Sequence, residues 1–369
     1  MKFAIITHAL HYQKKGQVFA YAPYVSEMNI WGRHVDEFII VAPPAKQIDP
    51  VINIPYQLDT IRWSRIPAFS LISIISVLRT IVVLPVVAIK IIRAFAAADH
   101  IHLRCPGNIG LLGCLVQIFF PGKPKTAKYA GNWGTNKKQP WSYRFQKWLL
   151  GNTFLTRNMQ VLVYGEWPNQ SKNIRPFFTA TYWDREKEPI IDRDYSGALR
   201  FVFIGTLSPG KQPSWAARFL ETLVANGKNA RIDFFGNGPE REDLENYISE
   251  NGLNESHILN GNQPKEAVKK ALKHAHFLIL PSLSEGWPKV VAEAMFWGCI
   301  PIVSPVSCVP WMLDDGKRGF LVSGNPEEEA KTFYEKLKSK DLSEISQRGI
   351  EWSRYYTLDK FEEEIKKLL

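Results

Sequence analysis

The chain is poor in cysteine and carries none of the cysteine spacings that hold small folds together. Its four cysteines form no Cys-x-x-Cys pair and have no histidines at zinc-finger spacing; they are Cys105, Cys114, Cys299 and Cys308. This argues against a disulfide framework and against a structural zinc site, and it favours a reducing cytosol. Internal repeats and low-complexity tracts are also absent from the sequence, which excludes a solenoid and a disordered chain.

The sequence has no uninterrupted hydrophobic run of membrane-spanning length. Its start, MKFAIITHAL, leads directly into a strand-like segment and shows no signal-peptide pattern. The stretch Phe69–Ile92 is mostly apolar and about as long as a span, but Arg79, Thr80 and Pro85 interrupt it. Because proline ends or kinks a helix, we expect two helices that meet at Pro85, partly in the core and partly against lipid headgroups.

Acidic residues are scarce in the first half of the chain. Residues 1–195 hold 24 Lys and Arg against 12 Asp and Glu, whereas the remaining residues hold 22 against 24. Such an excess is compatible with a solubility surface, an anionic acceptor, an anionic membrane face or nucleic acid. We expect a cytoplasmic protein, with peripheral contact to the inner membrane face as a further possibility.

What the sequence does contain is a regular alternation of strand-length apolar runs with helical patterns, which is typical of parallel α/β architecture. A chain of 369 residues suits two domains. We predict two Rossmann-like domains over residues 1–190 and 191–350, joined by a polar linker at Phe177–Leu199, and a helix over 351–369 that packs back toward the first domain. The predicted strands are Phe3–Thr7, Glu37–Ala42, His100–Leu103, Thr126–Ala130, Gln160–Tyr164, Arg200–Gly205, Ala230–Phe235, His257–Leu259, Phe277–Leu280, Ile300–Val303 and Phe320–Val322, and the predicted helices of the second half are Ser214–Asn226, Glu240–Asn251, Lys265–His274 and Lys289–Trp297.

The most informative segment is PSLSEGWPKVVAEAMFWGCIP, residues Pro281–Pro301. A buried strand ends in a Ser/Gly/Pro loop, and Pro288 stands at a helix start, where its missing amide hydrogen costs nothing. Glu285 lies in the loop and Glu293 on the helix, so both carboxylates can point toward the same end of the sheet. Free amides at the helix start suit a phosphate, and a carboxylate suits a ribose diol. Two glutamates alone would fit a helix N-terminus with favourable acidic residues equally well.

This segment resembles the signature of the retaining glycosyltransferase family 4, in which two glutamates are separated by seven residues. The resemblance covers the second domain: Phe201–Lys211 is similar to the family's first strand and phosphate-binding loop, Phe234–Glu245 to its glycine-rich turn, and Leu259–Val268 to the stretch before the next helix. It implies a GT-B fold, in which two Rossmann-like domains face each other across a cleft.

The resemblance also implies roles for residues. Glu285 and Lys211 would be catalytic, with Glu285 contacting the transferred sugar and Lys211 neutralising the diphosphate. A cation there makes independent sense, because charge grows on the leaving group in the transition state. Glu293 would bind the donor ribose, and the donor site as a whole would comprise Glu293, Thr206, Gly205, Gly236, Gly238, Gly286, Pro288 and Lys289. Thr206 stands where the family usually has an arginine, and we expect Lys289, Arg104 or the helix dipole to replace that cation.

In the first domain, the loop Thr7–Gln17 is expected to line the cleft. Gly16 would let backbone approach a ligand, and His8 and His11 are candidate acceptor-side groups, although loop histidines are more often structural. Where many family members carry a cleft histidine, this chain has KYAGNWG, and Asn132 is the candidate replacement. Arg104 completes this weaker set.

Two further motifs have competing interpretations. The aromatic and basic run Asn132–Trp148 could stack sugars or lie at a headgroup interface, but the spacing of Trp141, Phe145 and Trp148 favours the core face of a helix. Asp192-Arg193-Asp194 resembles a metal-binding Asp-x-Asp, but no strand precedes it, so we interpret it as unrelated to catalysis. No metal and no other cofactor are expected.

We therefore predict a metal-independent hexosyltransferase that moves sugar from a nucleoside diphosphate sugar to a saccharide or lipid-linked acceptor with retention. A nucleotide-sugar epimerase of the same fold is the alternative. A nucleic-acid-binding module is the third, but the sequence lacks a recognised motif for it.

Overall fold

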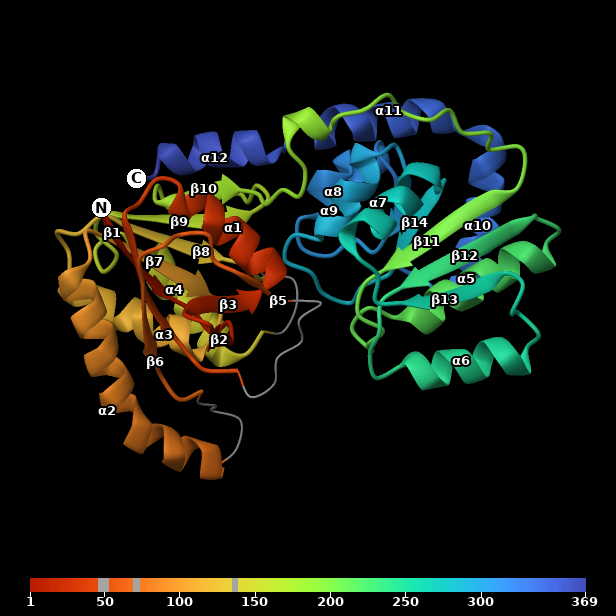
Figure 1. Ribbon diagram of the computed structural model, residues 1–369. Coiled ribbons are helices and arrows are strands. Elements are labelled where there is room, and N and C mark those ends of the chain that lie inside the picture. The colour runs from red at the N-terminus through yellow and green to blue at the C-terminus, as the bar shows by residue number, and fades with distance from the viewer. Residues whose placement is uncertain (46–52, 69–73, 135–138) are drawn as a thin grey trace. The chain divides into compact units, whose positions relative to one another are not determined.

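The computed structural model describes residues 1–45, 53–68, 74–134 and 139–369 (Figure 1). Internal contacts divide the chain into two compact units. The first is Met1–Phe178 together with Phe361–Leu369, and the second is Thr179–Lys360. The chain therefore leaves the first unit before residue 190, where the sequence suggested a boundary, and its last residues return to that unit.

The first unit is built on a sheet in which all seven strands are parallel. Its central strands are buried along most of their length, as expected for strands covered on both faces; β4 (Glu37–Ala42) is buried at all six positions. The strand order is β10 (Ile174–Phe177), β9 (Met159–Tyr164), β8 (Lys125–Tyr129), β7 (His100–Cys105), β1 (Lys2–Ile6), β4 and β6 (Ile61–Arg65).

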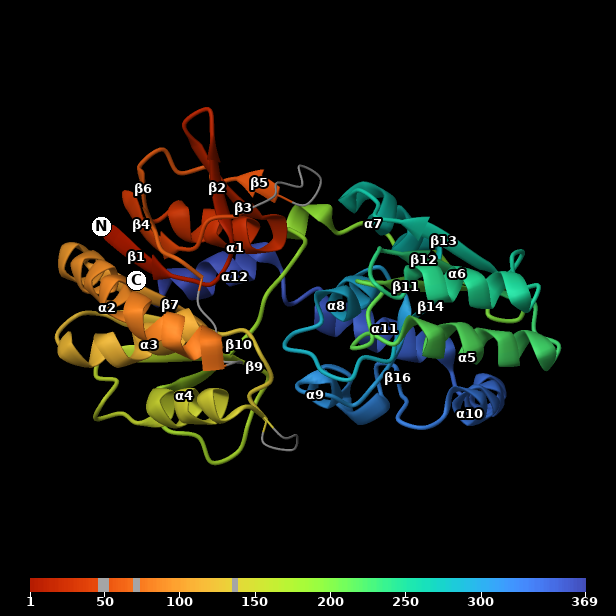
Figure 2. The ribbon, with the colours of Figure 1, turned by 90° about the horizontal axis from the view of Figure 1, so that it is seen from below.

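Helices cover both faces of this sheet. In Figure 1 its strands lie between α1 and α12 on one side and α2, α3 and α4 on the other, and Figure 2 shows the latter three together. Right-handed crossovers explain the division, because the chain leaves β1 in one direction and β7 in the opposite one. The helices are α1 (Ala22–Gly32), α2 (Ile74–Ala97), α3 (Asn108–Val116), which continues into the 3-10 turn η1 (Gln117–Phe119), α4 (Trp141–Gly151) and α12 (Leu358–Lys366).

Helix α2 corrects the expectation of two helices meeting at Pro85. The helix runs without a break through Pro85, which is exposed. Its core side packs through Val87, Ile91 and Phe95, and this packing outweighs the backbone hydrogen bond that proline removes. Among the described residues, no helix is both long and apolar enough to cross a membrane. Residues 69–73 of the apolar stretch lie outside the described part.

The segment after β1 forms a hairpin rather than the expected loop. Strands β2 (His11–Lys14) and β3 (Gln17–Tyr21) pair antiparallel, and β5 (Asn53–Pro55) adds to β3. Lys15 and Gly16 both have positive φ, 49° and 80°, as a two-residue type I′ turn requires. Gly16 is thus explained by the turn, and no other atom lies within 4 Å of a β-carbon built on it.

Helix α4 was expected to bury its aromatic residues, and that expectation is wrong. Trp141 is 63% exposed and Trp148 is 57% exposed, whereas Gln146, Leu149 and Leu150 face the core. Gln146, Leu149 and Leu150 are spaced i, i+3 and i+4, so they share one face of the helix, and this face is buried while the two tryptophans lie on the outer one.

The second unit has a six-stranded parallel sheet and confirms the α/β fold class. Helices α5 and α10 pack together, as do α8 and α11. The strand order is β13 (His257–Gly261), β12 (Ala230–Phe235), β11 (Leu199–Ile204), β14 (Phe277–Leu280), β15 (Ile300–Val303) and β16 (Phe320–Leu321). The helical segments are η2 (Asp184–Glu186), α5 (Pro213–Ala225), α6 (Arg241–Glu250), α7 (Lys265–His274), α8 (Lys289–Phe296), α9 (Val309–Met312), η3 (Asp314–Gly316), α10 (Pro326–Ser339) and α11 (Leu342–Ser353).

Arg193, the centre of the Asp-Arg-Asp motif, has a structural task. Its guanidinium donates to the carbonyls of Leu272, Lys273 and Ala275 at the end of α7 and to that of Trp297 at the end of α8, at 2.6–3.3 Å. A cation suits these two helix C-termini because their last carbonyls lack helical partners. The motif therefore stabilises the second unit at a place unrelated to its strand ends.

Candidate functional site

The strand order of the second sheet reverses between β11 and β14, and the predicted catalytic residues lie in the loops that follow these two strands. From β11 the chain winds outward through β12 and β13, and from β14 it winds the other way. Ligands of doubly wound sheets bind beyond the carboxyl ends of the strands at such a switch point. The loop after β11 carries Lys211 and the loop after β14 carries Glu285.

These two loops are in direct contact. Lys211 Nζ donates to Glu285 Oε1, and the amide of Leu283 donates to the carbonyl of Gly210 at 2.9 Å. The Lys211 side chain is 29% exposed and that of Glu285 is 10% exposed. The structure thus brings a partly accessible cation and an acidic group together at the strand ends.

The glycines predicted in the donor site are needed for the packing of its loops. A β-carbon on Gly236 would lie 1.9 Å from the carbonyl oxygen of Gly205, and one on Gly238 would lie 2.3 Å from that of Leu207. No side chain fits at either position. Gly205 has a φ of 158°, and its amide donates to Phe235 O at 2.9 Å. These contacts hold the loops after β11 and β12 side by side.

Glu293 lies in the middle of α8 and is held by a residue that sequence reasoning missed. Thr181 donates its hydroxyl hydrogen to Glu293 Oε1 at 2.6 Å. Burial raises the pKa of Glu293, and the Thr181 hydrogen bond and the positive charges of Lys289 and Lys265 oppose that rise. Thr181 belongs to a polar segment without a motif, so the sequence offered no signal for it.

The remaining donor-site candidates surround the start of α8. Pro288 is the N-cap residue of this helix, one position earlier than a first-turn proline, and Lys289 is its first residue. The carbonyl of Gly286 accepts hydrogen bonds from Ser307 Oγ and Cys308 Sγ, both at 3.1 Å. Thr206 is exposed and carries no charge in place of the usual arginine.

In the first unit, the corresponding switch point lies between β1 and β7. His8 follows β1, is exposed and lies beside Gly107, where a β-carbon would be 3.4 Å from His8 Nδ1. His11 is fully buried; its Nδ1 bonds Ala9 O at 2.8 Å and its Nε2 bonds Tyr56 Oη at 2.7 Å. Burial lowers the pKa of His11 to about 4. His11 is therefore a neutral core group.

Arg104 and Asn132 are both engaged within the first unit. Arg104 Nη1 donates to Glu27 Oε1 at 2.7 Å, and the same oxygen lies 3.0 Å from Nζ of the fully buried Lys128. Sequence reasoning did not bring this buried triad together, because its members are far apart in the chain. Asn132 Oδ1 accepts from the amide of Gly134 at 2.8 Å. Within the described ranges, no group of three or more His, Cys, Asp or Glu side chains could hold a metal ion.

Comparison with known proteins finds a family match in the second unit. Residues 184–352 match the family described as Glycosyl transferases group 1. The chain is 32% identical over 134 residues to the putative colanic acid biosynthesis glycosyltransferase WcaL of Salmonella typhimurium, covering 34% of this chain and 33% of that protein. It is 24% identical over 121 residues to the alpha-D-kanosaminyltransferase of Streptomyces kanamyceticus, covering 33% and 31%. The matched segments thus span about a third of the length of these relatives.

Solved structures are similar over the whole chain. The Anabaena protein HepE, solved in complex with UDP and glucose, aligns with a TM-score of 0.70 at 12% identity, covering 100% of this chain and 98% of that one. The sucrose-phosphate synthase of Thermosynechococcus elongatus aligns with a TM-score of 0.67 at 16% identity, with the same coverage. At this identity the likeness shows the fold. The match to the group 1 glycosyltransferases thus covers residues 184–352 of this chain, and the two doubly wound units have the architecture of the GT-B fold.

Proposed function

We propose that this protein is a glycosyltransferase that moves a hexosyl group from a nucleoside diphosphate sugar to a saccharide or lipid-linked acceptor in the cytosol, with retention and without a metal ion. The observation that carries the proposal is the contact of Lys211 with Glu285 at the switch point of the second sheet. A lysine at that place matches a diphosphate leaving group, and a glutamate beside it can contact the sugar that the diphosphate carries.

The reaction breaks the bond between the sugar C1 and the diphosphate oxygen, and it forms a bond between C1 and an acceptor oxygen on the same face. Lys211 compensates the charge that grows on the departing diphosphate, and that diphosphate takes the acceptor proton. In this reaction no side chain of the protein forms a covalent bond to the sugar. Glu293 binds the ribose, where a carboxylate can accept a hydrogen bond from each hydroxyl of the diol.

The test is release of nucleoside diphosphate from a panel of nucleotide sugars, with and without acceptor. UDP-glucose comes first in the panel, because the similar HepE structure holds UDP and glucose. A transferase releases nucleoside diphosphate when an acceptor is present, whereas an epimerase converts the donor without it. A donor that binds the native state also raises the melting temperature, which selects the panel members. Anomeric NMR of the product and activity in EDTA test retention and metal independence.

We also propose that the first unit, which would bind the acceptor, contacts an anionic membrane. Helix α2 presents a row of exposed aliphatic side chains at Val82, Val86, Ile89 and Ile92, exposed by 43–76%. Trp141 and Trp148 add exposed aromatic rings on α4, and this half of the chain carries the whole basic excess. Apolar side chains flanked by basic ones suit the interface of an anionic bilayer.

Purified protein is accordingly expected to co-sediment with vesicles that contain anionic lipid at low salt and to be released as salt rises. Each basic residue near the surface adds about 1 kcal/mol, and salt screens this attraction. Replacing Val86 and Ile89 together by serine should weaken the binding to vesicles. The control Ile258→Ser, which also replaces an exposed aliphatic side chain but lies in the second unit, should not. Equal sedimentation with neutral and anionic vesicles at low salt would contradict the contact.

A further inference from the structure

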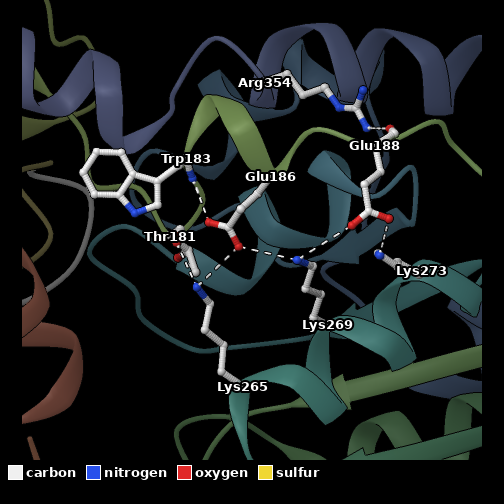
Figure 3. Close-up of polar contacts among 8 residues, drawn as sticks. All are labelled: Thr181, Trp183, Glu186, Glu188, Lys265, Lys269, Lys273 and Arg354. Carbon is white, nitrogen blue, oxygen red and sulfur yellow. Dashed lines mark hydrogen bonds and ion pairs between the residues drawn. The ribbon is translucent and has the colours of Figure 1, made fainter.

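A short segment of the second unit, Thr181–Glu188, is pinned along helix α7 by a ladder of lysines; we call it the strap (Figure 3). Lys265, Lys269 and Lys273 recur every four residues and so share one face of α7. Lys269 Nζ lies 3.4 Å from Glu186 Oε1, and Lys273 Nζ lies 2.6 Å from Glu188 Oε2. The two glutamates thus tie the strap to α7 at successive turns.

Aromatic contacts and backbone hydrogen bonds complete the attachment. Tyr182 is 4% exposed, and its ring packs against that of Phe296 at 4.8 Å. Lys265 Nζ lies 5.0 Å from the centre of the Tyr182 ring. Arg354 Nη2 donates to the carbonyl of Glu188 at 2.6 Å, so the far end of the strap is fixed as well. A segment held at each of these points can place a side chain accurately.

The side chain that it places is Thr181. Lys265 Nζ donates to the carbonyl of Thr181 at 3.3 Å, and the Thr181 hydroxyl donates to Glu293 Oε1 at 2.6 Å. A carboxylate oxygen has two lone pairs, so Oε1 keeps one acceptor site, and Oε2 keeps both with respect to this hydrogen bond. The contact therefore restricts the orientation of the Glu293 carboxylate and leaves it able to accept from both hydroxyls of a diol.

We propose that Thr181 is a positioning residue of the nucleotide-sugar site, whose hydroxyl orients the Glu293 carboxylate toward the ribose diol and is itself held by the strap. This rests on the proposed function, because it takes Glu293 as the ribose ligand. Thr181 touches no reacting atom and acts through Glu293.

The electrostatics of Glu293 agree with this role. Binding a diol requires the carboxylate in its ionised form, and burial raises its pKa. The groups that face it are Thr181 and Tyr182 of the strap, Lys265 of α7 and Lys289 of α8 itself. Of these, Thr181, Lys289 and Lys265 lower the pKa of Glu293. Loss of the hydroxyl should therefore raise that pKa further and move the loss of nucleotide affinity at low pH to a higher pH.

The experiment measures binding of a ribonucleoside diphosphate and of its 2′-deoxy counterpart by calorimetry, using the tightest binder among UDP, GDP, ADP and CDP. Thr181→Val removes the hydroxyl and keeps the branched shape, and Thr181→Ser keeps the hydroxyl. We expect Thr181→Val to weaken the ribonucleotide about 2- to 12-fold, the value of one hydrogen bond. The 2′-deoxynucleotide should lose less, so the preference for ribose should shrink, and Thr181→Ser should restore it.

A further test variant, Lys265→Met, removes the bond to the Thr181 carbonyl and a positive charge that lowers the pKa of Glu293, and it should shrink the same preference. An equal loss for both nucleotides in Thr181→Val, with an unchanged pH profile, would mean a merely structural role and would overturn the proposal. The same holds if Thr181→Ser fails to restore the preference. If wild-type protein binds no nucleoside diphosphate of the panel, the proposed function itself is overturned, which is a different result from unchanged binding in Thr181→Val.

Discussion

Replacing Lys211 by alanine is expected to lower turnover with a nucleoside diphosphate sugar about 100- to 1000-fold, the effect of removing one preorganised group that stabilises transition-state charge. The negative charge of the departing diphosphate is greatest in the transition state, so the loss should fall on kcat more than on donor affinity. Thr206 offers no second cation on the same loop. Lys211 should therefore compensate a larger share of the negative charge on the diphosphate than it would beside an arginine.

The fold should tolerate this change. Lys211 is partly exposed in a loop, and its contact is with Glu285 alone among the ion pairs of the described residues. A matched control is Lys338→Ala, which removes an exposed lysine of α10 that pairs with Glu335 on the same helix. Initial rates and thermal melts of both variants check the prediction. Turnover of Lys211→Ala close to that of the control would show that the diphosphate is held elsewhere.

The parallel strands could be predicted because burial on both faces leaves a plain signal. Runs such as FLIL in β14 and EFIIVA in β4 are apolar at almost every position, and the structure has both within the expected bounds. The hairpin of β2 and β3 was missed because its strands are short and its turn is Lys-Gly, a weaker signal than Asn-Gly. Pro85 led to the wrong prediction of a helix break, because the tertiary packing of α2 outweighed the local tendency of proline to end a helix.

The contacts of the candidate site also fall into two groups, those that the sequence predicts and those that it does not. The contact of Lys211 with Glu285 could be expected, because each residue lies in a motif and the sheet topology brings the two motifs together at the switch point. The contact of Thr181 with Glu293 could not be predicted, because it depends on a strap that α7, Phe296 of α8 and Arg354 hold in place. The buried triad of Arg104, Glu27 and Lys128 likewise joins residues from α1, β7 and β8. No local pattern in the sequence encodes such contacts.

Glu293→Ala is expected to weaken binding of the nucleoside diphosphate about 10- to 150-fold, because hydrogen bonds to a charged acceptor contribute roughly 1.5–3 kcal/mol. The loss should appear in the dissociation constant and in KM, since the ribose is bound alike in the ground state and in the transition state. It should also exceed the effect of Thr181→Val, because Thr181 only orients the group that Glu293 supplies.

Removing Glu293 should also change how the stability of the protein depends on pH. Its raised pKa means that the folded protein binds a proton at this carboxyl more tightly than the unfolded chain does. Ionisation of this carboxyl therefore opposes folding, and the penalty grows as pH rises from the ordinary carboxyl pKa to the raised folded-state pKa, above which it is constant. The expected pair of results is a melting temperature of Glu293→Ala that rises relative to that of wild type over this pH range, together with weakened nucleotide binding in calorimetry. Unchanged affinity would remove Glu293 from the donor site, and with it the role of Thr181.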